Sequence, residues 1–209
     1  MPLLHTLFQF DWLYLIGTAA FTVSGYLIGA RKQFDVLGVV ILALLTAIGG
    51  GMIRDVLVNR VPRIFLDAEP LYTIFMTLAV IWAIKLHRRN KGLLVKLFIV
   101  ADSIGLVAFS IAGAQVGIDA RLNLFGVAFL GFVSAVGGGL VRDMMVNDVP
   151  FILHEDFYGT VAILVAVALF GLYGLGYAGP IVAWPLFAGG LALRLIAHVR
   201  DFRLPRVDA

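Results

Sequence analysis

One seven-residue pattern, Gly-Gly-Gly-x-x-Arg-Asp, occurs twice in the chain, at residues 49–55 and 137–143. The two copies are 88 residues apart, and ten of the 17 positions in segments 49–65 and 137–153 are identical. Each copy places three consecutive helix breakers and a pair of opposite charges inside or at the edge of an apolar segment. The pattern therefore predicts an internal repeat, and the rest of the fold has to accommodate it.

Composition defines the class of protein. With 61% hydrophobic and 14% charged residues, the chain has more apolar side chains than a soluble domain of 209 residues can bury. The net charge of +3 does not indicate nucleic-acid binding, because the basic residues lie at the ends of apolar runs. The absence of cysteine excludes disulfides and thiolate metal sites. The chain contains no nucleophile triad, phosphate-binding loop or dinucleotide motif, so we predict a polytopic membrane protein that is not an enzyme.

The apolar runs predict an all-α membrane protein with seven transmembrane helices. Residues 12–86 form a first repeat of three helices, and residues 97–176 form a second. A seventh helix at 181–198 has no counterpart. Asp35 is expected to cap the second helix, residues 54–70 and 85–96 are expected to be a polar connection and a basic loop, and no cleavable signal peptide is expected in residues 1–11. The expected spans are 12–30, 36 onward, 71–86, 97–117, 124 onward, 157–176 and 181–198.

The distribution of basic residues predicts the orientation of the helices. With the amino terminus outside and the carboxyl terminus cytoplasmic, 12 of the 16 Lys and Arg residues lie on the inner side and four on the outer side. Because each repeat has an odd number of spans, the two repeats enter the membrane from opposite faces. Such inverted repeats are typical of transporters and of some channels.

The glycine triplets are predicted to break the second and fifth helices within the membrane. The second span reaches its triplet after 13 residues, or about 20 Å of helix, which is two-thirds of the hydrocarbon core. Unwound backbone at that depth has to face protein or a water-filled cavity. Free carbonyl groups there would suit a partly dehydrated monovalent cation. The segments concerned are Gly49, Gly50, Gly51 and Gly137, Gly138, Gly139.

Several polar side chains are candidates for the same pathway. Thr46 and Ser134 precede the triplets by three residues, and Thr22 and Ser110 are also related by the repeat; alternatively, each hydroxyl bonds a carbonyl of its own helix. Asp102 is predicted to be an acid within the membrane rather than a helix cap. The charges that follow the triplets are candidate gates at opposite mouths, with simple anchoring of the helix ends as the alternative. They are Arg54, Asp55, Arg142 and Asp143.

Other glycines are expected to serve packing. The spacing of Gly25 with Gly29, and of Gly113 with Gly117, allows helices to approach closely.

The doubled pattern within two three-helix repeats and a seventh helix resembles the prokaryotic members of the trimeric intracellular cation (TRIC) channel family. The resemblance covers nearly the whole chain. It implies a homotrimer in the cell membrane in which each protomer has its own potassium-permeable pore, bounded by the two helices with triplets. It implies no cofactor besides the permeant potassium ion, and allows bound lipid. The lysine-bearing fourth helix of the animal relatives has no match here, where Asp102 and Gln115 lie instead. Domains of this doubled type have also been described as transporters of small solutes such as glycine, so a secondary transporter is the alternative, and a membrane scaffold a more distant one.

Overall fold

The computed structural model describes residues 12–153, 157–200 and 202. The segment 1–11, for which no signal peptide is expected, and most of the basic tail beyond Arg200 lie outside the described residues.

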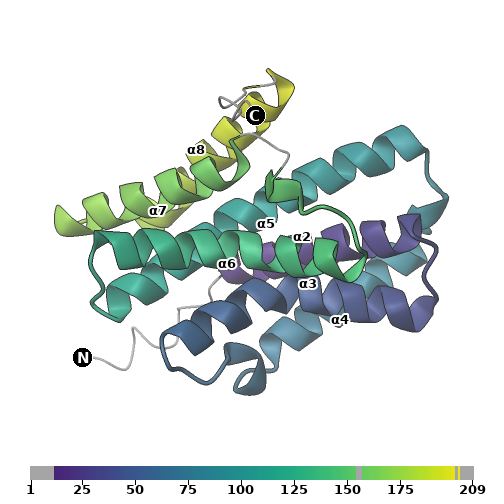
Figure 1. The fold of residues 1–209 in the computed structure, drawn as a ribbon, viewed down its shortest axis with the longest axis horizontal. Helices are drawn as coiled ribbons and strands as arrows, with labels where there is room; N and C mark the ends of the chain where they lie inside the picture. The colour runs from purple at the N-terminus through teal and green to yellow at the C-terminus, as the bar shows by residue number, and fades with distance from the viewer. Residues whose placement is uncertain (1–11, 154–156, 201, 203–209) are drawn as a thin grey trace, which may run out of the picture.

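Seven α-helices make up the described part of the chain, which contains no strand (Figure 1). Five of them are long and apolar enough to span a membrane, and α4 and α7 are shorter apolar helices. The all-helical, seven-helix fold is thus confirmed. Short 3-10 turns lie at Arg63–Phe65, Leu86–Arg88 and Phe151–Leu153. The α-helices are α2 (Trp12–Arg31), α3 (Val36–Leu57), α4 (Glu69–Ala83), α5 (Lys91–Asp119), α6 (Leu124–Met145), α7 (Tyr158–Gly174) and α8 (Pro180–Val199).

Local capping sets where several helices begin. The Asp35 carboxylate accepts a hydrogen bond from the Gly38 backbone N–H at 2.7 Å, and Asn123 accepts the equivalent bond in the second repeat at 2.9 Å. The predicted cap at Asp35 is therefore confirmed. Asn90 caps α5, so the helix begins at Lys91 and the predicted basic loop 85–96 is wrong for its last six residues. α3 also continues to Leu57, beyond the predicted start of the polar connection.

The ends of α3 and α6 explain a residue that recurs in the repeated segment. Asn59 and Asn147 have positive φ angles of 54° and 53°, just beyond the two helices. Asparagine tolerates this left-handed conformation better than most residues and commonly ends a helix in this way. The two turns that precede α3 and α6 match as well, because Gln33 and Arg121 have φ angles of 58° and 56°.

The predicted breaks in the second and fifth helices are wrong. α3 and α6 continue as α-helix through both triplets. Three glycines cost helix propensity of about 1 kcal/mol each relative to alanine. Tertiary packing of the two helices outweighs that cost, because the first two glycines of each triplet lie where α3 and α6 contact each other. There is consequently no unwound backbone at the triplets.

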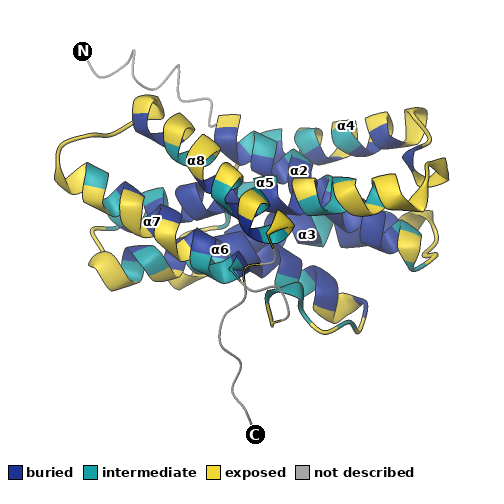
Figure 2. Cartoon of the chain, turned by 90° about the horizontal axis from the view of Figure 1, so that it is seen from above, coloured by how far each residue is buried: buried dark blue, intermediate teal, exposed yellow. Residues whose placement is uncertain are grey.

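The centre of the molecule is formed by α2 and α5, with α8 at the periphery. In an 18-residue apolar stretch of each helix, 72% of α2 is buried but only 28% of α8. Figure 2 shows the buried residues gathered on the inner faces of the helices. Phe21 and Phe109, which are related by the repeat, stack with ring centroids 5.3 Å apart. Each ring lies against a glycine of the other helix, Gly105 and Gly17 respectively. The two repeats therefore share one core, arranged about this aromatic pair.

Candidate functional site

The two glycine triplets meet where α3 and α6 cross. A methyl group built on Gly50 would overlap the carbonyl oxygen of Ser134, and one built on Gly138 would overlap that of Thr46. Only a residue without a side chain allows two helix backbones to approach so closely. Gly50 and Gly138 therefore let the two repeats touch at their centre. The first glycines of the triplets, Gly49 and Gly137, lie at the same crossing.

The third glycine of each triplet faces a different environment. A Cβ built on Gly139 would lie 3.5 Å from Nη2 of Arg142 and 3.6 Å from the hydroxyl of Tyr158. In the first repeat, a Cβ on Gly51 would lie 3.8 Å from Nη2 of the motif arginine and 3.9 Å from the hydroxyl of Tyr14. These are ordinary contact distances, so a methyl group would fit. The third glycine borders a polar cluster rather than the helix crossing.

The four predicted hydroxyl groups are buried and all donate to backbone carbonyls. Thr46, Ser134 and Thr22 bond the carbonyl four residues earlier in their own helices, at 2.6, 2.6 and 2.7 Å. Ser110 instead donates across to the carbonyl of Ala162 in α7 at 2.7 Å. Three of the four thus follow the alternative expected for helical Ser and Thr, and their role in a pathway stays a prediction.

The predicted packing glycines lie at helix contacts. A Cβ on Gly25 would lie 2.7 Å from both the Ala43 backbone and the Thr46 hydroxyl. Gly113 makes the repeat-related approach to α6, against Leu130 and Ser134. The packing interpretation of these glycines is confirmed.

The charged pairs after the triplets have the same geometry in both repeats. Nε of Arg54 donates to Asp55 at 2.8 Å, and Nε of Arg142 donates to Asp143 at 2.8 Å. The second oxygen of each carboxylate accepts a bond from the backbone N–H eight residues later, at 3.0 and 2.8 Å. Each aspartate therefore ties the arginine to the connection that follows its helix.

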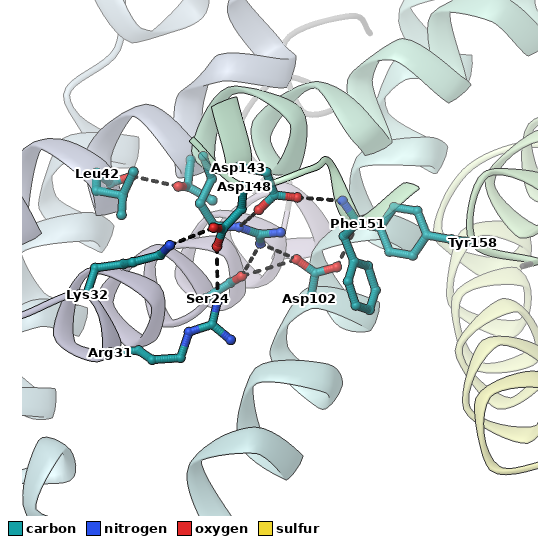
Figure 3. A network of polar contacts seen from close by, with 11 residues as sticks. Ser24, Arg31, Lys32, Leu42, Asp102, Asp143, Asp148, Phe151 and Tyr158 are labelled. Carbon is teal, nitrogen blue, oxygen red and sulfur yellow. Dashed lines mark hydrogen bonds and ion pairs between the residues drawn. The ribbon is translucent and has the colours of Figure 1, made fainter. Parts of the chain in front are cut away.

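The second repeat extends its pair into a larger buried network (Figure 3). Nη1 of Arg142 donates to Asp102 on α5 and to the Ser24 hydroxyl on α2. The hydroxyl of Tyr158 on α7 donates to the other oxygen of Asp102 at 2.6 Å. Ser24 itself contacts Asp102 at 3.1 Å. Together with Asp143, one arginine thus joins four helices at a single point.

Burial makes this network strong and costly to disrupt. Arg142 is 0% exposed and Asp102 is 1% exposed. Removing one partner of a buried ion pair leaves an uncompensated charge, which typically costs about 3–5 kcal/mol. The Arg142 guanidinium also lies 4.9 Å from the centre of the Phe98 ring. Asp102 is not a helix cap, because α5 begins eleven residues earlier and is capped by Asn90.

Three members of this region were not predicted from the sequence: Ser24, Tyr158 and Arg194. Ser24 corresponds to Ala112 under the repeat, so the repeat gave no indication of it. Arg194 is one of the 12 basic residues expected on the inner side, and its place within an apolar span does not indicate which residues it contacts. The structure places its guanidinium 5.1 Å from the Tyr158 ring centre.

A surface ion pair lies near the same end of the molecule. Asp148, after α6, contacts Lys32 at 2.6 Å and Arg31 at 3.2 Å, both at the end of α2. The hydrogen bond from Lys32, with the positive charges of both bases, lowers the pKa of the Asp148 carboxyl below its ordinary value. This pair connects the two repeats outside the membrane-spanning segments.

A cavity of about 280 Å³ lies between α2, α3 and α4, away from the helix crossing. None of the predicted pathway residues lines it, so it is not a candidate for the pathway. Its lining residues are Tyr26, Ala30, Phe34, Val36, Val39, Trp82 and His87.

The fold and these contacts define an integral membrane protein built from two related three-helix units and one additional helix. A family described as "Glycine transporter" matches the chain over residues 11–88 and 99–174, two segments that begin 88 residues apart. A UPF0126 membrane protein of Deinococcus radiodurans is 39% identical over 203 residues, covering 93% of this chain and 90% of the relative. The UPF0126 inner membrane protein YadS of Escherichia coli K12 is 31% identical over 153 residues, which is 73% of each chain.

Solved structures of TRIC channels have the same fold. One, from a study of conductance through TRIC cation channels, has a TM-score of 0.82 and 32% identity, covering 96% of this chain and 98% of that chain. The TRIC orthologue from Rhodobacter sphaeroides has a TM-score of 0.81 and 26% identity, covering 91% and 97%. The chain belongs to the family described as glycine transporter, and it shares the architecture of the prokaryotic TRIC channels.

Proposed function

We propose that the protein is a channel for monovalent cations, permeable to potassium, with one pathway in each protomer of a homotrimer. The observation that carries this proposal is the likeness to TRIC cation channels over 96% of the chain, at 32% identity. The amino terminus lies outside and the carboxyl terminus is cytoplasmic, in accordance with the distribution of basic residues. The permeant ion is the only small ligand required, and membrane lipids cover the outer helices.

The pathway proposed within the protomer follows the crossing of α3 and α6. Support comes from the contact of the two triplets, where the helices meet through Gly50 and Gly138 without intervening side chains. Small relative movements of the two helices would change the space there more than at a contact filled by large side chains. In the present conformation this crossing is tightly packed, so the proposed pathway is closed.

The buried network around Arg142 is proposed to hold the inner end of the pathway closed. It ties α6 to α2 and α5 directly, and to α7 through Tyr158. An opening that separates α6 from these helices has to break or hydrate the contacts between Arg142, Asp102 and Ser24. The Arg54–Asp55 pair occupies the corresponding position at the outer end.

Single-channel recording of the purified protein in planar bilayers tests the proposal. Unitary potassium currents are the expected result. Saturable glycine uptake into proteoliposomes without unitary currents would instead favour a secondary transporter, the second candidate, which the family description supports. Mass measurement in mild detergent tests the trimer, and a population of only monomers and dimers would contradict it.

A further inference from the structure

The seventh helix carries a buried positive charge into the centre of the molecule, although it is not part of the repeat. Arg194 on α8 is 1% exposed. One helical turn earlier, Gly190 lies so close to α7 and α5 that a Cβ there would be 2.7 Å from Val165 and 3.0 Å from Val107. The close approach at Gly190 fixes α8 against these helices and sets the depth of the Arg194 side chain.

Arg194 is placed against the two residues that hold the aspartates of the Arg142 network. Its guanidinium lies 5.1 Å from the centre of the Tyr158 ring and 5.9 Å from that of Phe151. The two rings pack edge to face with centroids 5.5 Å apart. The Tyr158 hydroxyl donates to Asp102, and the Phe151 backbone N–H donates to Asp143 at 2.8 Å.

The physical effect follows from the charge and the rings. A guanidinium near an aromatic face is attracted by the negative potential of that face, and the attraction grows when both groups are removed from water. An arginine that only anchored a helix at the membrane surface would expose its charged group, whereas Arg194 is buried. Its position therefore restrains the Tyr158 ring, whose hydroxyl holds Asp102, and the Phe151 ring that packs against it.

We infer that Arg194 is a positioning residue for the inner closure, which acts on Asp102 and Arg142 through Tyr158. It makes α8 the element that stabilises the closed arrangement of the repeated helices. The inference rests on the proposed channel function. Arg194 does not line the pathway and does not contact the permeant ion.

The test compares four proteins: wild type, Arg194→Met, Tyr158→Phe and the double variant. Methionine removes the charge and keeps an unbranched side chain, and phenylalanine removes only the hydroxyl group. We expect Arg194→Met to raise the open-to-closed ratio about tenfold, because a Tyr158 ring without this restraint weakens the hydrogen bond of its hydroxyl to Asp102, with unitary conductance unchanged. In the Tyr158→Phe background the same substitution should change the ratio less than about twofold, since non-additivity marks residues that act together.

Two results would overturn the inference. Equal effects of Arg194→Met with and without the Tyr158 hydroxyl would show that it does not act through Tyr158. A changed unitary conductance at an unchanged open-to-closed ratio would place Arg194 in the pathway itself. Arg200→Met, an exposed position at the end of the same helix, is the control and should behave as wild type. Arg194→Lys, which keeps the charge, should lie closer to wild type, and Arg194→Gln, which removes the charge, replaces the methionine variant if that variant does not fold.

Thermal unfolding of the same four proteins in detergent separates the inference from the proposed function. Coupling between Arg194 and Tyr158 in the unfolding midpoints does not depend on conduction. If wild type gives no unitary current but the midpoints are coupled, the channel proposal fails and the positioning role in the network stands. Additive midpoints contradict the positioning role, whatever the recordings show.

Discussion

Replacing Asp102 by Asn tests whether the buried network keeps the protein closed. One oxygen of Asp102 accepts from Arg142 and Ser24, and the other accepts from Tyr158 at 2.6 Å. Asparagine has the same shape but only one acceptor oxygen, and it carries no charge. Either Arg142 or Tyr158 therefore loses its acceptor, and Arg142 keeps a single carboxylate partner, Asp143.

The expected magnitude follows from the burial of this pair. Removing one partner of a buried ion pair costs about 3–5 kcal/mol, and the retained bond to Asp143 favours the lower end, about 3 kcal/mol. In an open conformation, water reaches these groups and the substitution costs little. The closed state is thus destabilised by about 3 kcal/mol relative to the open state, which raises the open-to-closed ratio about 100-fold. The same loss should lower the unfolding temperature by about 6–12 °C.

Single-channel recording measures the open-to-closed ratio, and thermal unfolding in detergent measures the unfolding temperature. Asp119→Asn is the matched control, because Asp119 is an exposed carboxylate at the end of the same helix. It should change neither value. A folded Asp102→Asn protein whose open-to-closed ratio stays within about threefold of wild type would refute the assignment of the network as the closure.

Three further predictions concern packing, charge and topology. Gly138→Ala should cost about 1–3 kcal/mol of stability in thermal unfolding because its methyl group overlaps α3, whereas Gly139→Ala, with room for a methyl group, should unfold near the wild-type temperature. Lys32 lowers the pKa of Asp148. The free energy of unfolding of wild type should therefore exceed that of Asp148→Asn by a constant amount above about pH 5, and the difference should disappear as acid protonates Asp148 below about pH 4. A difference that persists in acid would contradict the ion pair. A single cysteine in place of Asp119 should react with an impermeant maleimide in intact cells, and labelling only after permeabilisation would reverse the proposed orientation.

The features that could be predicted from the sequence depend on local chemistry or on the repeat. Asp35 caps its helix through a bond to a backbone group three residues away, so its role requires no knowledge of neighbouring helices. The two motif aspartates pair with the adjacent arginines in the same way in both copies. Because each of these features occurs in both copies of the repeat, the repeat supports the prediction of its six helices, whereas the seventh is predicted from its apolar run alone.

The features that could not be predicted depend on which helices become neighbours. Three consecutive glycines indicate a break when each helix is considered alone, yet the contact of Gly50 with α6 keeps the helix continuous. Tyr158 could not be found through the repeat, since its counterpart is Pro70. Arg194 lies outside the repeat altogether. Its contact with Tyr158 requires α8 to pack against α7, which sequence periodicity does not specify.

The difference between the two copies of the motif bears on the choice between channel and transporter. At the position related to Asp102, the first repeat has Tyr14, which carries no charge and whose ring lies under the Arg63 guanidinium at 4.6 Å. Among the described residues, Arg142 pairs with two carboxylates, Asp102 and Asp143, and Arg54 pairs with Asp55. A transporter that alternates access needs one closure at each of its two mouths, because each mouth has to be sealed while the other is open. A channel needs only one. Within the part of the chain that the structure describes, the larger buried network is the one around Arg142, and this asymmetry supports the proposed gated channel over alternating access.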